Sequence, residues 1–120
     1  MTVPASFALV VDEHLPLPAE DPPSGTVIAG DPRTFVRILD EPSDGTVCRG
    51  IWRMTPGVCA DVEADELFVV LAGRATVDIA GGDRLELTPG SVGVFAEGTE
   101  TVWTVHETLT KVFQITSPEG

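Results

Sequence analysis

Positive charge is scarce in this sequence, and the scarcity narrows the range of partners. The chain has 7 lysine and arginine residues against 19 aspartate and glutamate residues, for a formal net charge of −12 over 120 residues. Proteins that bind nucleic acids neutralise phosphates with basic side chains, and anionic membrane surfaces attract basic patches. We therefore expect neither a nucleic acid nor a membrane as a partner. The acidity is sufficient to keep a small protein dissolved.

Cysteine is also rare, because the sequence contains only Cys48 and Cys59. A secreted chain of this size that relied on disulfides would contain more of them. Residues 1–11 lack the basic start and the cleavage signal of a secretory leader, and no apolar run approaches the length of a membrane span. We therefore expect a cytoplasmic protein with reduced thiols.

Helical periodicity is the third missing feature. The 10 prolines and 12 glycines are too many for a helical bundle, because both residues interrupt helices. Short apolar runs instead recur every 8–12 residues or so, between turn signals, as in antiparallel sandwiches and barrels. We predict an all-β fold. The candidate strands are residues 26–29, 34–39, 46–54, 58–62, 66–71, 75–79, 84–88, 91–95, 101–106 and 110–115.

The beginning of the chain has a different composition. Prolines cluster at positions 16, 18, 22 and 23, and this density favours extended, polyproline-like backbone. We predict that residues 1–25 form an extended Pro-rich arm, which either lies on the domain or crosses to a partner. Residues 26–120 are then a single barrel domain.

Spaced glycines in the second half carry a family resemblance. Gly73 follows Glu66 after six residues, and Gly98 closes a segment that begins at Gly90. This arrangement resembles the two motifs of the cupin superfamily. The wider set is similar to the single-domain branch that contains ureidoglycine aminohydrolase and the ethanolamine-utilisation cupins. That set is Trp52, Pro56, Gly57, Asp65, Glu66, Gly73, Pro89, Gly90, Gly98, Trp103, Glu107 and Lys111.

The resemblance implies a small antiparallel jelly-roll barrel, dimeric as a rule, with a pocket for a small molecule between its sheets. Cupin metal sites use three histidines and one glutamate, and Glu66 stands at the glutamate position. The histidine positions hold Cys59, Asp61 and Thr101 instead. One interpretation is a barrel that needs no cofactor. The other is a divalent metal held by Cys59, Asp61 and Glu66, since thiolates and carboxylates bind such ions.

Glu66 is the leading candidate for a catalytic group. A carboxyl group among apolar neighbours is poorly solvated, which raises its pKa and suits general acid–base catalysis near neutral pH. The alternative is that Glu66 is simply paired, for example with Lys111. Lys111 alternates with apolar residues and so faces inward, where it could bind a substrate carboxylate, unless it merely protects a strand edge. Asp61 is the third candidate for the catalytic set.

The substrate-binding candidates are inferred from strand parity, because side chains two positions apart share a face. Trp103 shares parity with Thr101, and Cys59 shares parity with Asp61. Two tryptophans could wall a pocket that grips a flat or apolar ligand. The predicted substrate contacts are Trp52, Cys59, Phe68, Thr101 and Trp103.

Three functions remain open on this evidence. The first is a metal-independent acid–base enzyme of the isomerase, cyclase or lyase type, with Glu66 as the proton-transfer group. The second is a metal-dependent hydrolase resembling ureidoglycine aminohydrolase, in which the metal activates water. The third is a non-catalytic ligand-binding or structural cupin. We expect a homodimer in each case.

Overall fold

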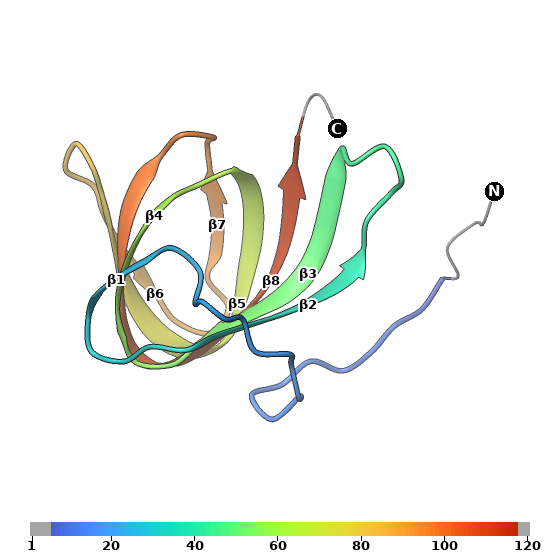
Figure 1. The fold of residues 1–120 in the computed structure, drawn as a ribbon, viewed down its shortest axis with the longest axis horizontal. Coiled ribbons are helices and arrows are strands. Elements are labelled where there is room, and N and C mark those ends of the chain that lie inside the picture. Colours follow the sequence, from blue (N-terminus) through green and yellow to red (C-terminus); the bar gives the residue numbers. More distant parts are fainter. Residues whose placement is uncertain (1–5, 118–120) are drawn as a thin grey trace.

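The computed structural model describes residues 6–117, and all regular structure in this range is antiparallel β-strand, curled into a jelly-roll barrel (Figure 1). None of the described residues forms a helix that could span a membrane. The strands are β1 (Thr26–Ala29), β2 (Thr34–Asp40), β3 (Val47–Met54), β4 (Gly57–Val62), β5 (Asp65–Ile79), β6 (Arg84–Leu87), β7 (Val92–Phe95) and β8 (Glu100–Thr116).

Strand β8 is the centre of the sheet. One of its edges pairs first with β4 and then with β3, and its other edge pairs with β5 along almost the whole length. Strand β1 continues the sheet beyond β4, and β2 continues it beyond β3, while β6 and β7 both pair with β5. The curl of this sheet brings β3, β4, β5 and β8 around one interior (Figure 1).

Two predicted strand breaks do not exist. Residues 66–71 and 75–79 belong to the single strand β5, and residues 101–106 and 110–115 belong to β8. The pairing of β5 with β8 shifts register between Val70 and Ala75, on both sides of Gly73. The strand therefore bends at Gly73 without ending. Gly73 has a φ of 87°, and a Cβ there would lie 2.1 Å from the Thr108 carbonyl oxygen. Only glycine fits this crossing.

Alternation along the strands separates the interior from the surface. On β8, Trp103 and Val105 are buried, whereas His106 is exposed. On β5, Phe68 and Val70 are fully buried. These aromatic and β-branched side chains fill the barrel interior, and burying each contributes about 1.5–3 kcal/mol.

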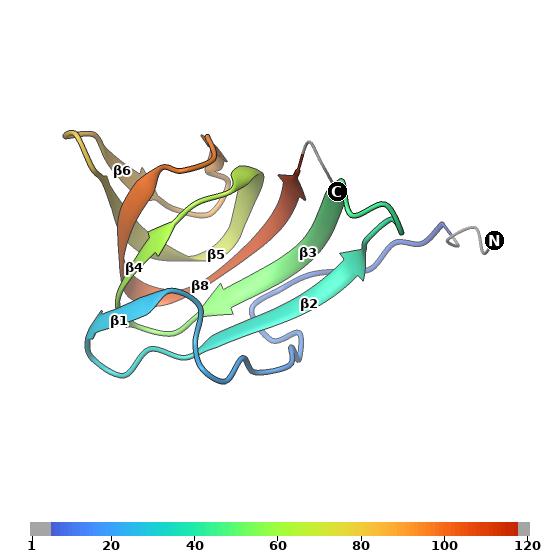
Figure 2. The same ribbon diagram turned by 45° about the horizontal axis from the view of Figure 1, so that its top comes forward.

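The described part of the arm, residues 6–25, lies against the barrel (Figure 2). The Glu20 amide donates to the Thr34 carbonyl at 2.9 Å, and the Val36 amide donates to the Pro18 carbonyl at the same distance. The Arg53 guanidinium of β3 holds the preceding turn through the Leu15 carbonyl at 2.7 Å. The arm therefore extends the sheet beside β2. Residues 1–5 of the predicted arm lie outside the described residues.

Candidate functional site

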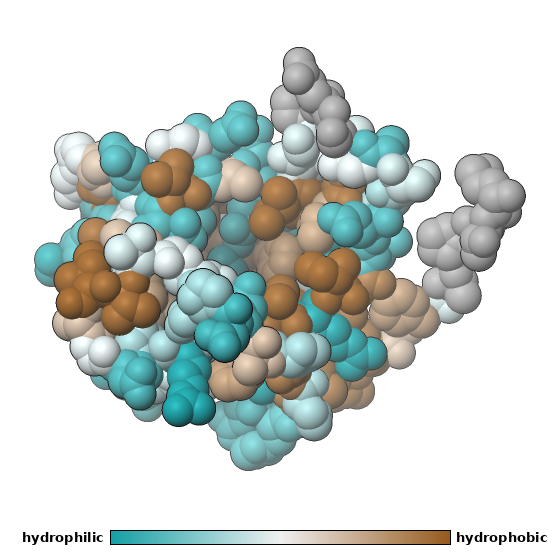
Figure 3. Space-filling model, in the orientation of Figure 1, coloured by the Kyte–Doolittle hydropathy of each residue, from teal (hydrophilic) through white to brown (hydrophobic). Residues whose placement is uncertain are grey.

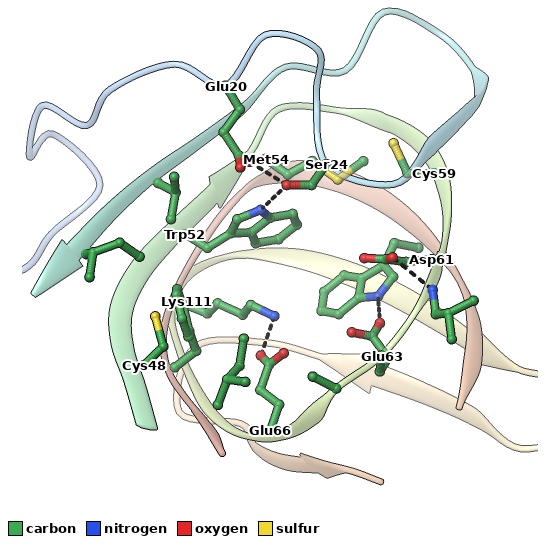
Figure 4. Close-up of a pocket in the computed structure, with 17 residues that line it drawn as sticks. Glu20, Ser24, Cys48, Trp52, Met54, Cys59, Asp61, Glu63, Glu66 and Lys111 are labelled. Atoms are coloured by element: carbon green, nitrogen blue, oxygen red, sulfur yellow. Dashed lines mark hydrogen bonds and ion pairs between the residues drawn. The ribbon is translucent and has the colours of Figure 1, made fainter. Parts of the chain in front are cut away.

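A cavity of about 330 Å³ opens at one end of the barrel. In Figure 3 apolar side chains flank a recess on this face of the molecule. Strands β2, β3, β4, β5 and β8 supply the walls together with the connection between β4 and β5, and the arm supplies part of the rim (Figure 4). The lining residues are Glu20, Ser24, Val36, Ile38, Cys48, Trp52, Met54, Cys59, Asp61, Val62, Glu63, Ala64, Glu66, Trp103, Lys111, Phe113 and Ile115.

Glu66 and Lys111 form a buried ion pair in this cavity (Figure 4). The Lys111 Nζ donates to Glu66 Oε2 at 2.6 Å, and both residues are less than a tenth exposed. Desolvation raises the pKa of Glu66 above its ordinary value, although Lys111 opposes the shift; Glu63 and Asp61 add to it. Both predictions for Glu66 are thus combined, because the carboxyl is poorly solvated and also paired.

Lys111 is not at a strand edge, because β8 is paired on both sides there. Its ammonium lies 4.8 Å from the centroid of Trp52 and 4.9 Å from the centroids of Phe68 and Trp103. Ring faces attract cations, most strongly where water is excluded. We call Trp52, Phe68 and Trp103 the aromatic cage. It holds the ammonium beside Glu66 in the cavity wall.

Glu63 is the residue that the sequence analysis missed. It lies between β4 and β5 and is buried, and its Oε2 accepts hydrogen bonds from Thr101 Oγ1 at 2.7 Å and from Trp103 Nε1 at 3.0 Å. Strand alternation could have identified Glu63, because positions 59, 61 and 63 share one face of an extended strand. The predicted strand stopped one residue too early to use it.

Asp61 and Cys59 occupy the β4 side of the cavity. Asp61 is exposed at the rim as a whole residue. Its carboxyl is partly shielded from water by the cavity walls, and this desolvation together with the charge of Glu63 raises its pKa. Cys59 is buried, and desolvation followed by the charge of Asp61 raises the pKa of its thiol. A thiol with a raised pKa is a poor nucleophile. Its position fits ligand contact better than covalent chemistry.

The arm contributes a hydrogen-bonded chain to the rim. Ser24 Oγ donates to a carboxylate oxygen of Glu20, and Trp52 Nε1 donates to Ser24 Oγ at 3.4 Å (Figure 4). The ring of Trp52 then meets the ring of Trp103 edge to face, with centroids 5.6 Å apart. One side of the cavity is thereby fixed by two residues that come from outside the strands.

Most of the predicted site residues come together, and two stand behind the cavity wall. Trp52, Cys59, Asp61, Glu66, Trp103 and Lys111 all line the cavity. Phe68 is fully buried beneath Lys111, stacked on Phe95, and Thr101 faces Glu63. Neither Phe68 nor Thr101 is a lining residue.

The family of the chain follows from a match over most of its length. The family model of the EutQ-like cupin domain matches residues 41–113. The chain belongs to the EutQ-like cupins. A search of curated proteins finds no match.

Solved structures share the fold of this EutQ-like cupin. The Clostridium difficile EutQ protein is 13% identical, with a TM-score of 0.65 over 74% of this chain and 71% of that one. Ectoine synthase from P. lautus is 15% identical, with a TM-score of 0.63 over 69% and 63%. A protein of unknown function from Pseudomonas syringae pv. tomato is 24% identical, with a TM-score of 0.75 over 88% of this chain and 46% of its own.

The donor set of this EutQ-like cupin does not fit the metal centre that the superfamily resemblance implied. Across residues 6–117, no three His, Cys, Asp or Glu side chains gather as metal ligands do. Cys59, Asp61 and Glu66 line one cavity without forming such a set. The Lys111 ammonium instead occupies a position 2.6 Å from Glu66, and the Thr101 hydroxyl is directed at Glu63. The alternative ligand set of Cys59, Asp61 and Glu66 is therefore not assembled.

Proposed function

We propose that the cavity binds a small organic molecule with a positively charged end, and that Glu66 transfers a proton to or from it. The observation that carries the proposal is the charge of the lining. Four acidic side chains, Glu20, Asp61, Glu63 and Glu66, face a cavity that contains a single basic one, Lys111. An acidic cleft with low-dielectric walls concentrates cations.

The aromatic walls support the same ligand class. Trp52 and Trp103 line the cavity beside these carboxylates. Indole faces attract cations by about 0.5–2 kcal/mol, depending on desolvation. Carboxylates supply the directional part of the binding, since a charge-assisted hydrogen bond contributes roughly twice as much as a neutral one. An ammonium or guanidinium group satisfies both kinds of contact.

Glu66 is the group suited to move the proton. Its raised pKa lies closer to neutrality than that of a solvated carboxyl, which favours general acid–base catalysis. Only its Oε2 has a hydrogen-bond partner within residues 6–117, so Oε1 is free to meet a ligand. Isomerisation, cyclisation and elimination all need such a transfer. Ectoine synthase shows that this fold can carry a synthase, although at 15% identity the analogy extends to the fold alone.

Intrinsic fluorescence tests the binding step. The chain has two tryptophans, both in the cavity wall, and no tyrosine, so a bound ligand changes the whole signal. We expect ethylamine, tetramethylammonium and guanidinium to shift the emission, and acetate and glycerol to leave it unchanged. Equal responses to the three cations and to acetate or glycerol would overturn the cation preference.

Exchange of carbon-bound hydrogens tests the proton transfer. A ligand found in the binding screen is incubated with the protein in D2O, and its C–H signals are followed by NMR. We expect exchange with the wild type and a loss of about 10²–10⁴-fold in Glu66→Gln. The matched control is Glu107→Gln, which removes an exposed carboxyl on the outer face and should exchange normally. Binding without exchange would indicate a non-catalytic binding protein.

A further inference from the structure

Lys111 is the single lysine of the chain, and the other six basic side chains are all arginine. The only lysine is therefore also the only basic residue in the cavity, at 6% exposure among the rings of the aromatic cage. We propose that Lys111 is a nucleophile whose amine forms an imine with an aldehyde or ketone group of the ligand. This inference rests on the proposed function, because it names the substrate class of the same cavity.

An arginine could fill a purely structural role at this place. Its guanidinium would pair with Glu66 in a bidentate manner and stack on the rings of the aromatic cage. Arginine stays protonated in proteins, however, and cannot form an imine. Desolvation in an apolar pocket favours the neutral amine, which is the nucleophilic form of lysine, and a neighbouring carboxylate can serve as the acceptor of its proton. Here the acceptor is Glu66, at 2.6 Å.

The protons balance within the pair. The Lys111 ammonium gives one proton to the Glu66 carboxylate, and the neutral amine attacks the carbonyl carbon to form a C–N bond. Glu66 returns that proton to the former carbonyl oxygen, a second nitrogen-bound proton follows it, and the C–O bond breaks. The oxygen leaves as water. The products are a protonated imine on Lys111 and an ionised Glu66, so the net charge of the pair is unchanged.

The imine also explains why acid–base chemistry follows. A protonated imine withdraws electrons from the adjacent carbon, so a hydrogen on that carbon becomes acidic. Glu66, left as a carboxylate beside the nitrogen, is placed to remove it. The positive end of the ligand then faces Asp61 and Glu63 across the cavity. The substrate class is a small carbonyl compound that carries an amino group.

Reductive trapping tests the inference on the full chain. Aminoacetone, a small amino ketone, is incubated with the wild-type protein and sodium cyanoborohydride, which reduces an imine to a stable secondary amine. Intact mass spectrometry counts the adducts, and peptide mapping locates them. The chain offers only two amines, Lys111 and its N-terminus. We expect the adduct on Lys111, and butanone, which lacks the positive charge, to react more slowly.

Variants of Lys111 and Glu66 distinguish the role of the nucleophile from the role of its proton acceptor. Lys111→Arg retains the positive charge but has no amine that can form an imine, so it should lose the adduct. Glu66→Gln should retain the lysine and form the adduct more slowly, with an altered pH profile. An adduct confined to the N-terminus, or binding of aminoacetone by the wild type with no adduct, would overturn the role of Lys111. In the second case Glu66-dependent hydrogen exchange would still support the proposed function.

Discussion

Glu63 and Glu66 lie three positions apart, are equally buried at 7% exposure, and face the same cavity, yet their partners differ in kind. Glu63 accepts from an indole N–H and a hydroxyl, which hold their protons throughout the working pH range. Glu66 accepts from an ammonium, which can give its proton away. For two equally buried carboxylates we therefore propose different roles: Glu63 holds Trp103 and Thr101 in place, and Glu66 takes part in proton transfer.

Breaking the ion pair on one side should have the largest effect. Glu66→Leu leaves the Lys111 ammonium buried without a counter-charge, and such a change costs about 3–5 kcal/mol of the free energy of unfolding. The double variant Glu66→Leu, Lys111→Met removes both charges and should recover most of that loss. Urea denaturation of the wild type, both single variants and the double variant measures the coupling. A double variant no more stable than Glu66→Leu would show that the pair is not coupled.

Removing the other carboxylate should cost less. Glu63→Leu deprives the Trp103 N–H of its acceptor, at about 1–3 kcal/mol, whereas the Thr101 hydroxyl can turn to the Asp61 carbonyl, now 3.5 Å away. Glu63→Gln retains an acceptor oxygen and should be nearly as stable as the wild type. The same denaturation experiment measures both. If Glu63→Gln were as damaging as Glu66→Leu, the contrast between neutral and ionic partners would be wrong.

The pH dependence of stability should further distinguish Glu66 from Glu63. A carboxyl whose pKa is raised in the folded state binds its proton more tightly than in the unfolded chain. Its contribution is complete below the ordinary value of 4.5 and is lost as the pH rises through the folded pKa. The free energy of unfolding of the wild type relative to Glu66→Gln should therefore fall as the pH rises above 4.5. A relative stability that increased with pH would contradict the raised pKa.

The smallest effect is expected at the rim. Ser24→Ala removes the hydroxyl that links Trp52 to Glu20, a loss of about 0.5–1.5 kcal/mol for a hydrogen bond of ordinary strength. Neither Glu63 nor Glu66 is hydrogen-bonded to Ser24, Glu20 or Trp52, so both should keep their partners. Urea denaturation measures the change in stability. Tryptophan emission shows whether the surroundings of Trp52 and Trp103 in the cavity wall have changed. An unchanged emission spectrum would show that Trp52 keeps its position without the Ser24 hydroxyl.

The strands were predictable because alternation and turn residues are local signals. The continuity of β5 was not, because a glycine that ends one strand and a glycine that bends another look alike in sequence. Gly73 becomes a bend only because Thr108 and its neighbours on β8 approach it. That contact is created by the pairing of distant residues.

The residues of the candidate site likewise divide into those predictable from local signals and those placed by contacts between distant parts of the chain. Parity placed Trp103, Asp61 and Lys111 on the inner face, because each belongs to a regular strand. It could not find Glu20 or Ser24, which lie in an arm without periodicity and reach the cavity only because residues 18–20 pair with β2. The pairing of Glu66 with Lys111 was an open alternative, since only the curl of the sheet brings residues 45 positions apart to 2.6 Å.

The rim and the walls of the cavity come from different parts of the chain. The match to the EutQ-like cupins begins at residue 41, so Glu20 and Ser24 belong to a segment outside it. The segment is attached mainly through backbone hydrogen bonds to β2, which tolerate many side chains. We therefore expect that discrimination between ligands can be redesigned in residues 18–24 without altering the barrel or its ion pair. Gly25 must stay, because a Cβ there would lie 2.5 Å from the Ala60 carbonyl oxygen. A library confined to that short segment would explore new specificities on a scaffold whose chemistry stays constant.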